Sequence, residues 1–126
     1  MERDMADDIR TLLKIDEVVD ITTTGRKTGE ARRIEIRLHV LDGKLYLTGR
    51  PGMPRSWYAN MMANPAITIH LKQTLQQDVP STASAVRDPD ERRRVFARML
   101  ELESRMSHVD PEVWAETAPL VELTPA

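Results

Sequence analysis

The chain has 126 residues, a formal net charge of -2 at pH 7 and no cysteine. One domain is the simplest organisation at this length, and the absence of cysteine excludes disulfides, thiolate catalysis and metal sites with cysteine ligands. No segment approaches the roughly 20 apolar residues of a membrane span, and the first residues lack the apolar core of a secretion signal. We therefore expect an intracellular, cytoplasmic protein.

Positive charge is concentrated in one part of the chain. Residues 26–55 carry eight cationic and three anionic side chains, which leaves 10 cationic and 17 anionic side chains for the rest. A nucleic-acid-binding domain carries a basic surface over much of its length, so we do not expect a nucleic-acid partner. A local cationic site for a small anion fits this distribution, and a solvated surface is the alternative.

The first predicted elements are a short helix and two strands. Apolar residues at helical spacing predict an amphipathic helix over residues 5–15. A β-branched run predicts a strand over residues 18–24, and strict alternation predicts a second strand over residues 33–41 with one buried face. The helix face comprises Met5, Ile9, Leu12 and Leu13; the apolar strand face comprises Ile34, Ile36, Leu38 and Val40, and the polar face Arg33, Glu35, Arg37 and His39.

A hairpin joins the second strand to a third. Asp42 and Gly43 are the strongest short hairpin signal in the chain, because both tolerate a positive φ. We predict that the third strand spans residues 44–49 and that Leu45 and Leu47 face inward. Three antiparallel strands would thus follow one another in sequence.

The next predicted elements are a short helix and a fourth strand. Ser56 can cap a helix over residues 57–64, and Pro65 ends it because proline disfavours helical geometry in the residue before it. Alternation then predicts a strand over residues 66–71.

The last part of the chain contains a weaker strand, a helix and a terminal strand. Pro80 indicates that the strand predicted over residues 79–86 lies at an edge or begins there, because proline lacks a backbone N–H. Asp88 is predicted to cap a helix that runs to near His108, and residues 119–124 can add a sixth strand. The apolar stripe of this helix comprises Val95, Phe96, Met99, Leu100, Leu102 and Met106.

These elements predict a single α+β domain over residues 1–126. Successive hairpins and a returning final strand favour an antiparallel barrel or a strongly curved sheet of about six strands, with helices packed outside. Closing such a sheet removes its unpaired edges.

The predicted topology gathers positive charge at one end of the sheet. The connection 25–30 between the first two strands carries Arg26 and Lys27, and the third strand returns to the same side, where it ends near Arg50. The following helix start presents unpaired N–H groups, which favour an anion, and Arg55 precedes it. We therefore predict a site for a phosphate-bearing ligand at this end.

Two common nucleotide-binding loops do not account for this site. Gly25 and Gly29 are separated by only three residues and lie in a predicted hairpin, whereas a Walker loop opens a helix after a parallel strand. The chain also lacks the G-x-G-x-x-G pattern, so we do not expect a Rossmann site.

A compound motif combines several of these residues. It consists of Thr22-Thr23-Thr24-Gly25-Arg26-Lys27-Thr28-Gly29, Arg33, Gly43-x-x-Tyr46-Leu47 and Trp57-Tyr58-x-Asn60-x-x-Ala63-Asn64-Pro65. Over residues 18–72 the chain resembles the deazaflavin-dependent nitroreductase family. The resemblance implies a split β-barrel like that of flavin mononucleotide-binding oxidoreductases, and hydride transfer from the reduced deazaflavin coenzyme F420.

The resemblance and the charge pattern together predict a set of cofactor-binding residues. Arg26, Lys27, Thr28 and Arg33 would hold the phosphate and acidic tail of the coenzyme. The strand end at Thr48 and Gly49 would pass close to the deazaflavin ring. The full predicted set is Arg26, Lys27, Thr28, Arg33, Thr48, Gly49, Arg50, Arg55, Trp57, Tyr58 and Asn60. For Trp57 and Asn60 a purely structural role is the alternative.

The implied chemistry needs little from the side chains. The coenzyme supplies the hydride, so no side-chain nucleophile is required. A proton must also reach the acceptor, and Tyr58 or water is the candidate donor. His39, His70 and His108 show no clustering typical of metal ligands, so no metal is expected.

The expected function is an F420-dependent oxidoreductase that acts on a small electron-poor acceptor such as a nitroaromatic, a quinone or an enone. Two alternatives stay open: a deazaflavin or flavin carrier without turnover, and a flavin mononucleotide-dependent oxidoreductase on the same barrel. Flavin mononucleotide lacks the oligoglutamate tail and would have less use for so many cations. A homodimer is expected by analogy alone.

Overall fold

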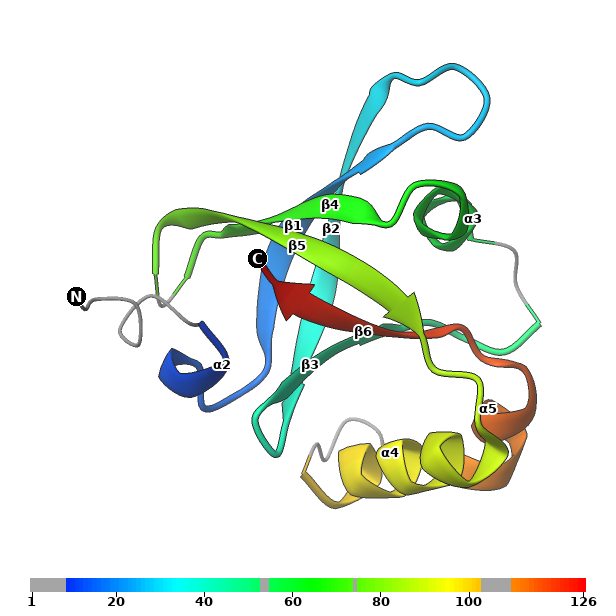
Figure 1. Ribbon diagram of the computed structural model, residues 1–126. Coiled ribbons are helices and arrows are strands. Elements are labelled where there is room, and N and C mark those ends of the chain that lie inside the picture. The colour runs from blue at the N-terminus through cyan, green and yellow to red at the C-terminus, as the bar shows by residue number, and fades with distance from the viewer. Residues whose placement is uncertain (1–8, 53–54, 74, 103–109) are drawn as a thin grey trace.

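The computed structural model describes residues 9–52, 55–73, 75–102 and 110–126 (Figure 1). The elements in chain order are α2 (Ile9–Leu12), β1 (Glu17–Thr24), β2 (Ala31–Leu41), β3 (Lys44–Thr48), α3 (Ser56–Ala63), β4 (Ala66–Leu71), β5 (Gln77–Ala85), α4 (Pro89–Leu102), α5 (Pro111–Thr117) and β6 (Leu120–Pro125).

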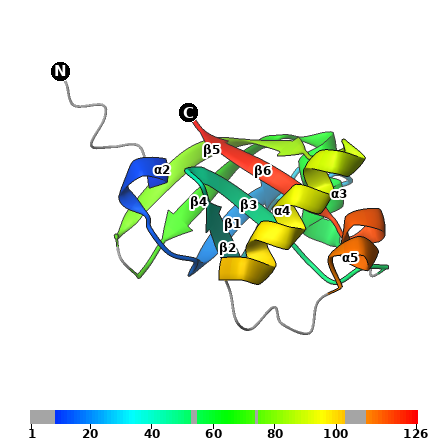
Figure 2. The same cartoon turned by 90° about the horizontal axis from the view of Figure 1, so that it is seen from below.

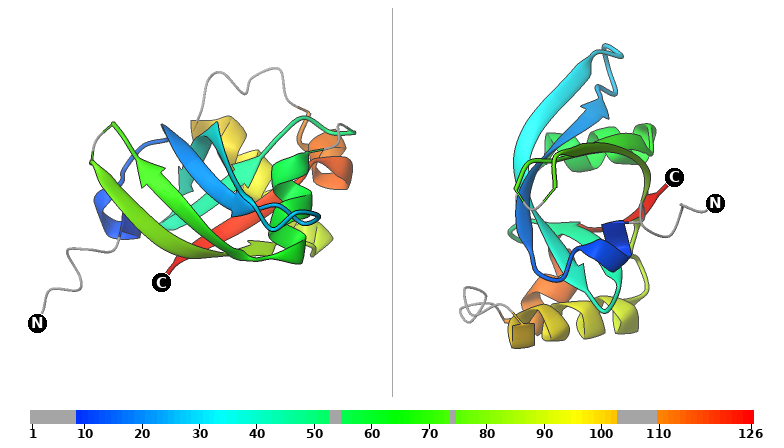
Figure 3. Two further views of the ribbon diagram at one scale, coloured as in Figure 1. Left: turned by 90° about the horizontal axis from the view of Figure 1, so that it is seen from above. Right: turned by 90° about the vertical axis from the view of Figure 1, so that its left-hand side faces the viewer.

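Six strands form a closed barrel in the order β1-β2-β3-β6-β5-β4, and every neighbouring pair is antiparallel. The predicted fold class is therefore confirmed. The β2–β3 turn also has the expected geometry, with Asp42 at φ 51° and Gly43 at φ 79°. Figure 1 and the right-hand view of Figure 3 show that the β1–β2 hairpin projects beyond the body of the barrel, beside α3.

The apolar residues form two cores on the two sides of the barrel wall. Inward-facing strand residues such as Ile21, Leu45 and Leu47 fill the interior together with Trp57 and Met61 of α3. The second core lies outside the barrel, where α4 and α5 pack against the sheet (Figures 1 and 2). Its members include Phe96 and Met99, which are both fully buried. In β3, for example, Leu45 and Leu47 face the inner core and Tyr46 faces the outer core, so both faces of this strand are buried and its apolar residues do not alternate with polar ones.

The predicted burial of the apolar face of β2 is confirmed only for the C-terminal half of the strand. Leu38 and Val40 lie in the inner core, whereas Ile34 is 36% exposed because this part of β2 belongs to the projecting hairpin. On the opposite face, His39 is only 5% exposed, although its face was predicted to be polar. Tertiary contacts, not the strand period, therefore set burial at both ends of this strand.

The starts of two helices differ from prediction. Arg55, not Ser56, occupies the N-cap of α3, and no side chain caps this helix. The helix α5 was not predicted, although Asp110 accepts a hydrogen bond from the Glu112 N–H at 3.0 Å and Pro111 follows the cap. The same cap-and-proline signal was recognised at the start of α4, where Asp88 accepts from the N–H of residue 91 at 2.8 Å.

Parts of two predicted helices lie outside the described residues. These are Met5 in the first helix, and Met106 and His108 at the end of the helix that contains α4. Within the described residues the first helix covers only Ile9–Leu12. Leu102, predicted to belong to the apolar stripe of α4, is 53% exposed.

The prediction that Pro80 marks an edge strand or a strand start was wrong. It lies inside β5, which pairs with β4 on one side and β6 on the other. A strand residue directs its N and C=O to the same neighbour, and the Pro80 C=O accepts from the Ala126 N–H at 2.9 Å. The backbone N of Pro80, which has no hydrogen to donate, therefore faces the end of β6. The pairing of β5 with β6 stops there, at Ser81 and Pro125, so no strand hydrogen bond is lost.

The side chain of Arg92, in α4, is hydrogen-bonded to the C-terminal end of α5. Its guanidinium donates to the backbone C=O of Val86 at 2.8 Å and of Ala115 at 2.6 Å, and also to those of Trp114 and Ala118. The Ala115 and Ala118 carbonyls belong to the last turn and cap of α5, where helix C=O groups lack intrahelical partners, whereas the Trp114 C=O also accepts from the Ala118 N–H at 2.9 Å. Burial lowers the pKa of Arg92 below its usual range, but a guanidinium still keeps its charge in proteins. A positive charge at a helix C-terminus also interacts favourably with the helix dipole.

A partly buried hydrogen bond between Asp16 and His39 joins the segment before β1 to β2. Asp16 Oδ2 lies 2.9 Å from His39 Nδ1, and Asp16 Oδ1 accepts from the Val40 N–H at 2.8 Å. Burial raises the pKa of Asp16, but the hydrogen bonds from His39 and Val40 outweigh burial, and the net pKa lies below 3.8. The carboxylate form is therefore more stable in the folded than in the unfolded chain.

We predict that Asp16→Asn lowers the free energy of unfolding by about 1 to 2 kcal/mol at neutral pH. Because the folded-state pKa of Asp16 is depressed, its contribution is present above the unfolded value and disappears as pH falls through the folded value. Urea unfolding of wild type and variant should therefore converge well below pH 3.8. The matched control is Asp78→Asn, which removes the exposed carboxylate that bonds to His70 and should change stability by less than about 0.5 kcal/mol. Equal effects of both variants at all pH values would contradict this account.

Candidate functional site

A cavity of about 330 Å³ lies between the β1–β2 hairpin and the first two turns of α3. We call it the hairpin cavity. Its lining residues are Thr23, Gly25, Arg26, Lys27, Thr28, Arg32, Ile34, Ser56, Trp57 and Asn60. The basic connection and the helix start therefore meet at one place.

Glycine suits two positions of the hairpin connection, Gly25 and Gly29. The Gly25 N–H donates to the Glu30 C=O at 2.7 Å, and the Gly29 N–H donates to the Gly25 C=O at 2.9 Å. A Cβ at Gly25 would lie 3.1 Å from Thr28 Oγ1 and 3.2 Å from the Glu30 oxygen, which is closer than ordinary contact. Gly29 adopts φ 75°, which suits glycine. This tight loop holds Arg26 and Lys27 beside the cavity.

Asn60 connects α3 to the hairpin. Its Oδ1 accepts from the Arg26 N–H at 3.1 Å, and its Nδ2 donates to Thr23 Oγ1 at 3.1 Å. The side chain is 5% exposed, so both polar ends are used inside the protein. This arrangement favours the structural alternative for Asn60 and fixes the helix start relative to the loop.

Arg32 and Arg33 point to opposite faces of β2, because successive strand residues alternate in direction. Arg32 pairs with Thr23 across the hairpin and lines the cavity, whereas Arg33 pairs with Thr22 and lies on the opposite face. There Arg33 Nε donates to Asp20 Oδ2 at 2.9 Å. Hydrogen bonds from Lys72 and then Arg33 lower the pKa of Asp20. Sequence reasoning selected Arg33 and missed Arg32, although the alternation of β2 already placed Arg32 on the face of Ile34.

Two other predicted site residues do not line the hairpin cavity but lie across the first turn of α3 from it. Arg55 and Tyr58 line a second cavity of about 420 Å³, which we call the second cavity. Its remaining lining residues are Val86, Arg87, Arg92, Glu116, Thr117, Ala118 and Pro119. Trp57 and Tyr58 touch edge to face, with ring centroids 6.1 Å apart, so consecutive residues line the two cavities.

Arg55 carries a buried polar atom without a partner. Its Nε is buried and forms no hydrogen bond with the described residues. A Cβ on Gly49 would lie only 2.8 Å from this atom, so glycine leaves room for the guanidinium. Thr48 next to it donates from its hydroxyl to the Pro119 C=O at 2.6 Å. Arg50 is exposed and lines neither cavity.

The hairpin cavity has the electrostatics of an anion site. Arg26, Lys27 and Arg32 line it, and none of its described lining residues is acidic. Only Arg32 has an ion-pair partner among the described residues, the exposed Glu30 at 3.1 Å. The start of α3 adds unpaired N–H groups, since its N-cap makes no side-chain bond.

Residues 1–114 match the sequence profile of a family described as F420H(2)-dependent quinone reductase. The chain belongs to this family. It is thus an F420-dependent oxidoreductase, and its cofactor is coenzyme F420, the first of the two predicted cofactors. No curated protein sequence matches the chain significantly.

Solved structures support the same fold for this F420-dependent oxidoreductase. An F420-H2 dependent reductase, FDR-A, is 26% identical with a TM-score of 0.59, over 84% of this chain and 92% of that one. An F420 reductase is 21% identical with a TM-score of 0.63, over 93% and 92%. A domain-swapped dimer is 24% identical with a TM-score of 0.60, over 84% and 78%. The barrel is therefore of the split β-barrel type.

The described residues of this oxidoreductase fit its cofactor. A phosphate and an acidic tail need cations and N–H donors, which the hairpin cavity has, and the unpartnered Arg55 Nε lies just across the first turn of α3. Among the described residues no group of His, Asp or Glu could hold a metal ion. No helix in that part of the chain is long and apolar enough to cross a membrane. The cytoplasmic location stays a prediction.

Proposed function

We propose that the hairpin cavity holds the negatively charged arm of coenzyme F420 and that the enzyme reduces a small electron-poor acceptor, a quinone in the first instance. The observation that carries this proposal is the set of three cationic side chains around a cavity without an acidic lining residue. The description of the family, which names quinones, supports the acceptor class.

Each group of residues would have a separate task in this proposal. Arg26, Lys27 and Arg32 would bind the phosphate and carboxylate groups, and the free N–H groups at the start of α3 would add to this binding. Thr28, which also lines the hairpin cavity, would contact the same groups. The bound coenzyme supplies the hydride, and the side chains bind, orient and exclude water. Arg33, which the resemblance assigned to the coenzyme, points to Asp20 and would not contribute directly.

We further propose that the second cavity admits the acceptor. It adjoins the hairpin cavity through Trp57 and Tyr58, and the Tyr58 side chain lines it. The Tyr58 hydroxyl would hold the proton that the reduced acceptor needs, and water is the alternative donor. Arg55, with its unpartnered Nε, would hold a polar group of either ligand at the boundary.

A fluorescence titration tests the cofactor part of the proposal. The chain has two tryptophans, so Trp114→Phe leaves Trp57 as the single reporter at the hairpin cavity. We expect F420 to change the Trp57 emission saturably and flavin mononucleotide to bind more weakly, because it carries fewer negative groups. Absence of a saturable change with F420, or equal affinity for both compounds, would contradict the proposed site.

A turnover assay tests the acceptor part. Reduced F420 bound to the enzyme should be reoxidised on addition of menadione, followed by the loss of the reduced deazaflavin spectrum. Nitroaromatic acceptors should be compared in parallel. Binding of F420 without reoxidation by any acceptor of a broad panel would leave the cofactor site intact and overturn the quinone assignment.

We propose a homodimer as the solution state. A solved structure of the same fold, described as a domain-swapped dimer, supports this proposal. Size-exclusion chromatography with light scattering would measure the molar mass directly, and a mass near 14.4 kDa would contradict a dimer.

A further inference from the structure

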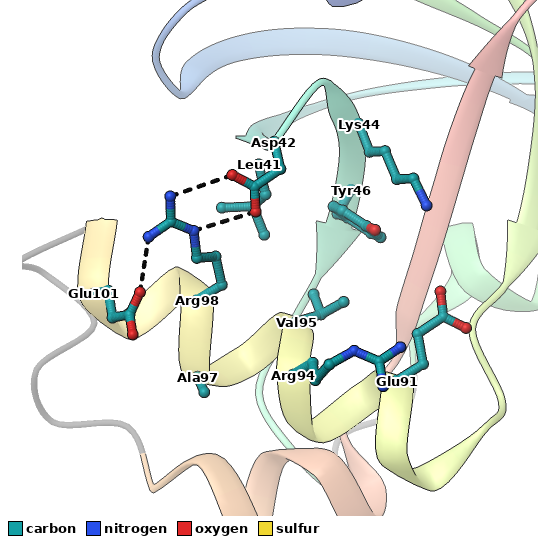
Figure 4. A pocket seen from close by; sticks show the side chains of 10 residues that line it. All are labelled: Leu41, Asp42, Lys44, Tyr46, Glu91, Arg94, Val95, Ala97, Arg98 and Glu101. Carbon is teal, nitrogen blue, oxygen red and sulfur yellow. Dashed lines mark hydrogen bonds and ion pairs between the residues drawn. The ribbon is translucent and has the colours of Figure 1, made fainter.

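A third cavity, of about 420 Å³, lies between α4 and the β2–β3 turn (Figure 4). We call it the α4 cavity. The helix α4 and the β2–β3 turn lie at the end of the molecule opposite the projecting β1–β2 hairpin (Figure 1). The α4 cavity shares no lining residue with the hairpin cavity, so the two are separate. The lining residues of the α4 cavity are Leu41, Asp42, Lys44, Tyr46, Glu91, Arg94, Val95, Ala97, Arg98 and Glu101.

One wall of the α4 cavity is apolar. Leu41, Tyr46 and Val95 belong to the outer core between α4 and the barrel, and Ala97 extends the wall along the helix. The volume lies within the range of small-molecule sites, which combine apolar walls with a few convergent polar groups. A flat apolar group of one or two rings would fit such a wall.

The hydroxyl of Tyr46 opens to the α4 cavity. Tyr46 as a whole is only 4% exposed, but its hydroxyl is not among the buried side-chain atoms that lack a partner, and it makes no hydrogen bond with the described residues. The hydroxyl is therefore accessible to a ligand, while the ring is held in the outer core. Burial, followed by the charges of Glu122, Glu91 and Asp42, raises the pKa of Tyr46 to about 12. The hydroxyl therefore stays protonated at neutral pH and can donate a hydrogen bond.

The cations of the α4 cavity fall into two groups. Arg98 is already neutralised, since it contacts Asp42 at 3.2 Å and Glu101 at 2.8 Å. Lys44 and Arg94 form no ion pair with the described residues. Figure 4 shows Lys44, the Tyr46 hydroxyl and Arg94 toward one end of the cavity, with the carboxylate of Glu91 beside them. Glu91 likewise forms no ion pair within the described part of the chain.

We infer that the α4 cavity binds a small organic acid, an aromatic ring system that carries one carboxylate. The ring would lie on Leu41 and Val95, and the carboxylate would accept hydrogen bonds from Tyr46, Lys44 and Arg94. Glu91 opposes the anion and keeps the affinity modest. This site is independent of the cofactor and of the acceptor.

An NMR titration of the full chain in the presence of F420 tests this inference. The probe is 2-naphthoate, and neutral 2-naphthamide is its matched control. We expect saturable shifts of the backbone amides of residues 41–46 and 91–98 with 2-naphthoate and weaker binding of the amide. No saturable shift up to about 10 mM would overturn the inference. Shifts confined to residues 25–34 and 55–58 would also overturn it, because they would place the probe in the cavities of the proposed function.

Three variants separate the polar contacts from general effects. Tyr46→Phe removes one hydroxyl, and Arg94→Ala removes an exposed charge; each should weaken 2-naphthoate about tenfold. Arg93→Ala removes the same charge one residue away, outside the α4 cavity, and should leave the affinity unchanged. If Tyr46→Phe does not fold, the comparison of 2-naphthoate affinity between Arg94→Ala and Arg93→Ala is sufficient to test the inference. Equal affinity in Arg94→Ala and Arg93→Ala would overturn the inference.

Discussion

Arg92→Ala should lower the free energy of unfolding by about 3 kcal/mol. The guanidinium donates to four backbone C=O groups, of Val86, Trp114, Ala115 and Ala118, and the variant leaves all four without this donor. It also removes the cation 5.9 Å from the Phe96 ring centroid. Urea unfolding followed by far-ultraviolet circular dichroism would measure the loss.

Two further variants define the origin of this effect. Arg93→Ala, at the exposed neighbour on α4 that pairs with Asp90, should change stability by less than about 0.5 kcal/mol. Arg92→Lys should recover only part of the loss, because an ammonium group cannot reproduce the planar fork of donors. A loss below about 1 kcal/mol in Arg92→Ala would show that water replaces the guanidinium at these carbonyls.

Lys27→Ala and Arg32→Ala should each weaken F420 binding by about 1 to 3 kcal/mol, or roughly 5- to 150-fold. Both side chains line the hairpin cavity, and each would lose a charge-assisted hydrogen bond to the coenzyme. Protein stability should hardly change, because both residues are exposed. The Trp57 fluorescence titration in the Trp114→Phe background measures the affinity.

Arg33→Ala is the matched control, because it removes the same charge from the adjacent residue of β2. Arg33 lies on the other face of the strand and bonds to Asp20, so we expect its loss to change F420 affinity by no more than about twofold. A larger loss in Arg33→Ala than in Arg32→Ala would restore the assignment drawn from the resemblance and contradict the parity argument.

The local structure of the chain could largely be predicted from its sequence. The turn at Asp42 and Gly43 and the cap at Asp88 depend on short-range φ preferences and hydrogen bonds between near neighbours. Strand β4 was predicted with its observed limits, because its alternation is complete between Pro65 and the end of the apolar residues. The cationic connection was recognised for a similar reason, since charge and glycine positions can be counted along the chain.

The partners of individual side chains could not be predicted in this way. Asn60 bonds to Arg26 and Thr23, which lie 34 and 37 residues away, and Arg92 bonds to carbonyls up to 26 residues away. Such contacts depend on how the helices are placed on the barrel, and a sequence period carries no information about that placement. The partition of predicted site residues between two cavities has the same origin.

The sequence by itself determined the order of the strands along the chain, the two turns that contain glycine and the presence of a basic loop close to a helix start, because these features follow from local periodicity and turn chemistry. Only the tertiary structure decided that Arg32 and not Arg33 faces the hairpin cavity, that Tyr58 lies across α3 from it, and that Pro80 is inside the barrel. Strand parity fixes which residues share a face, but closure of the barrel fixes which face is inside.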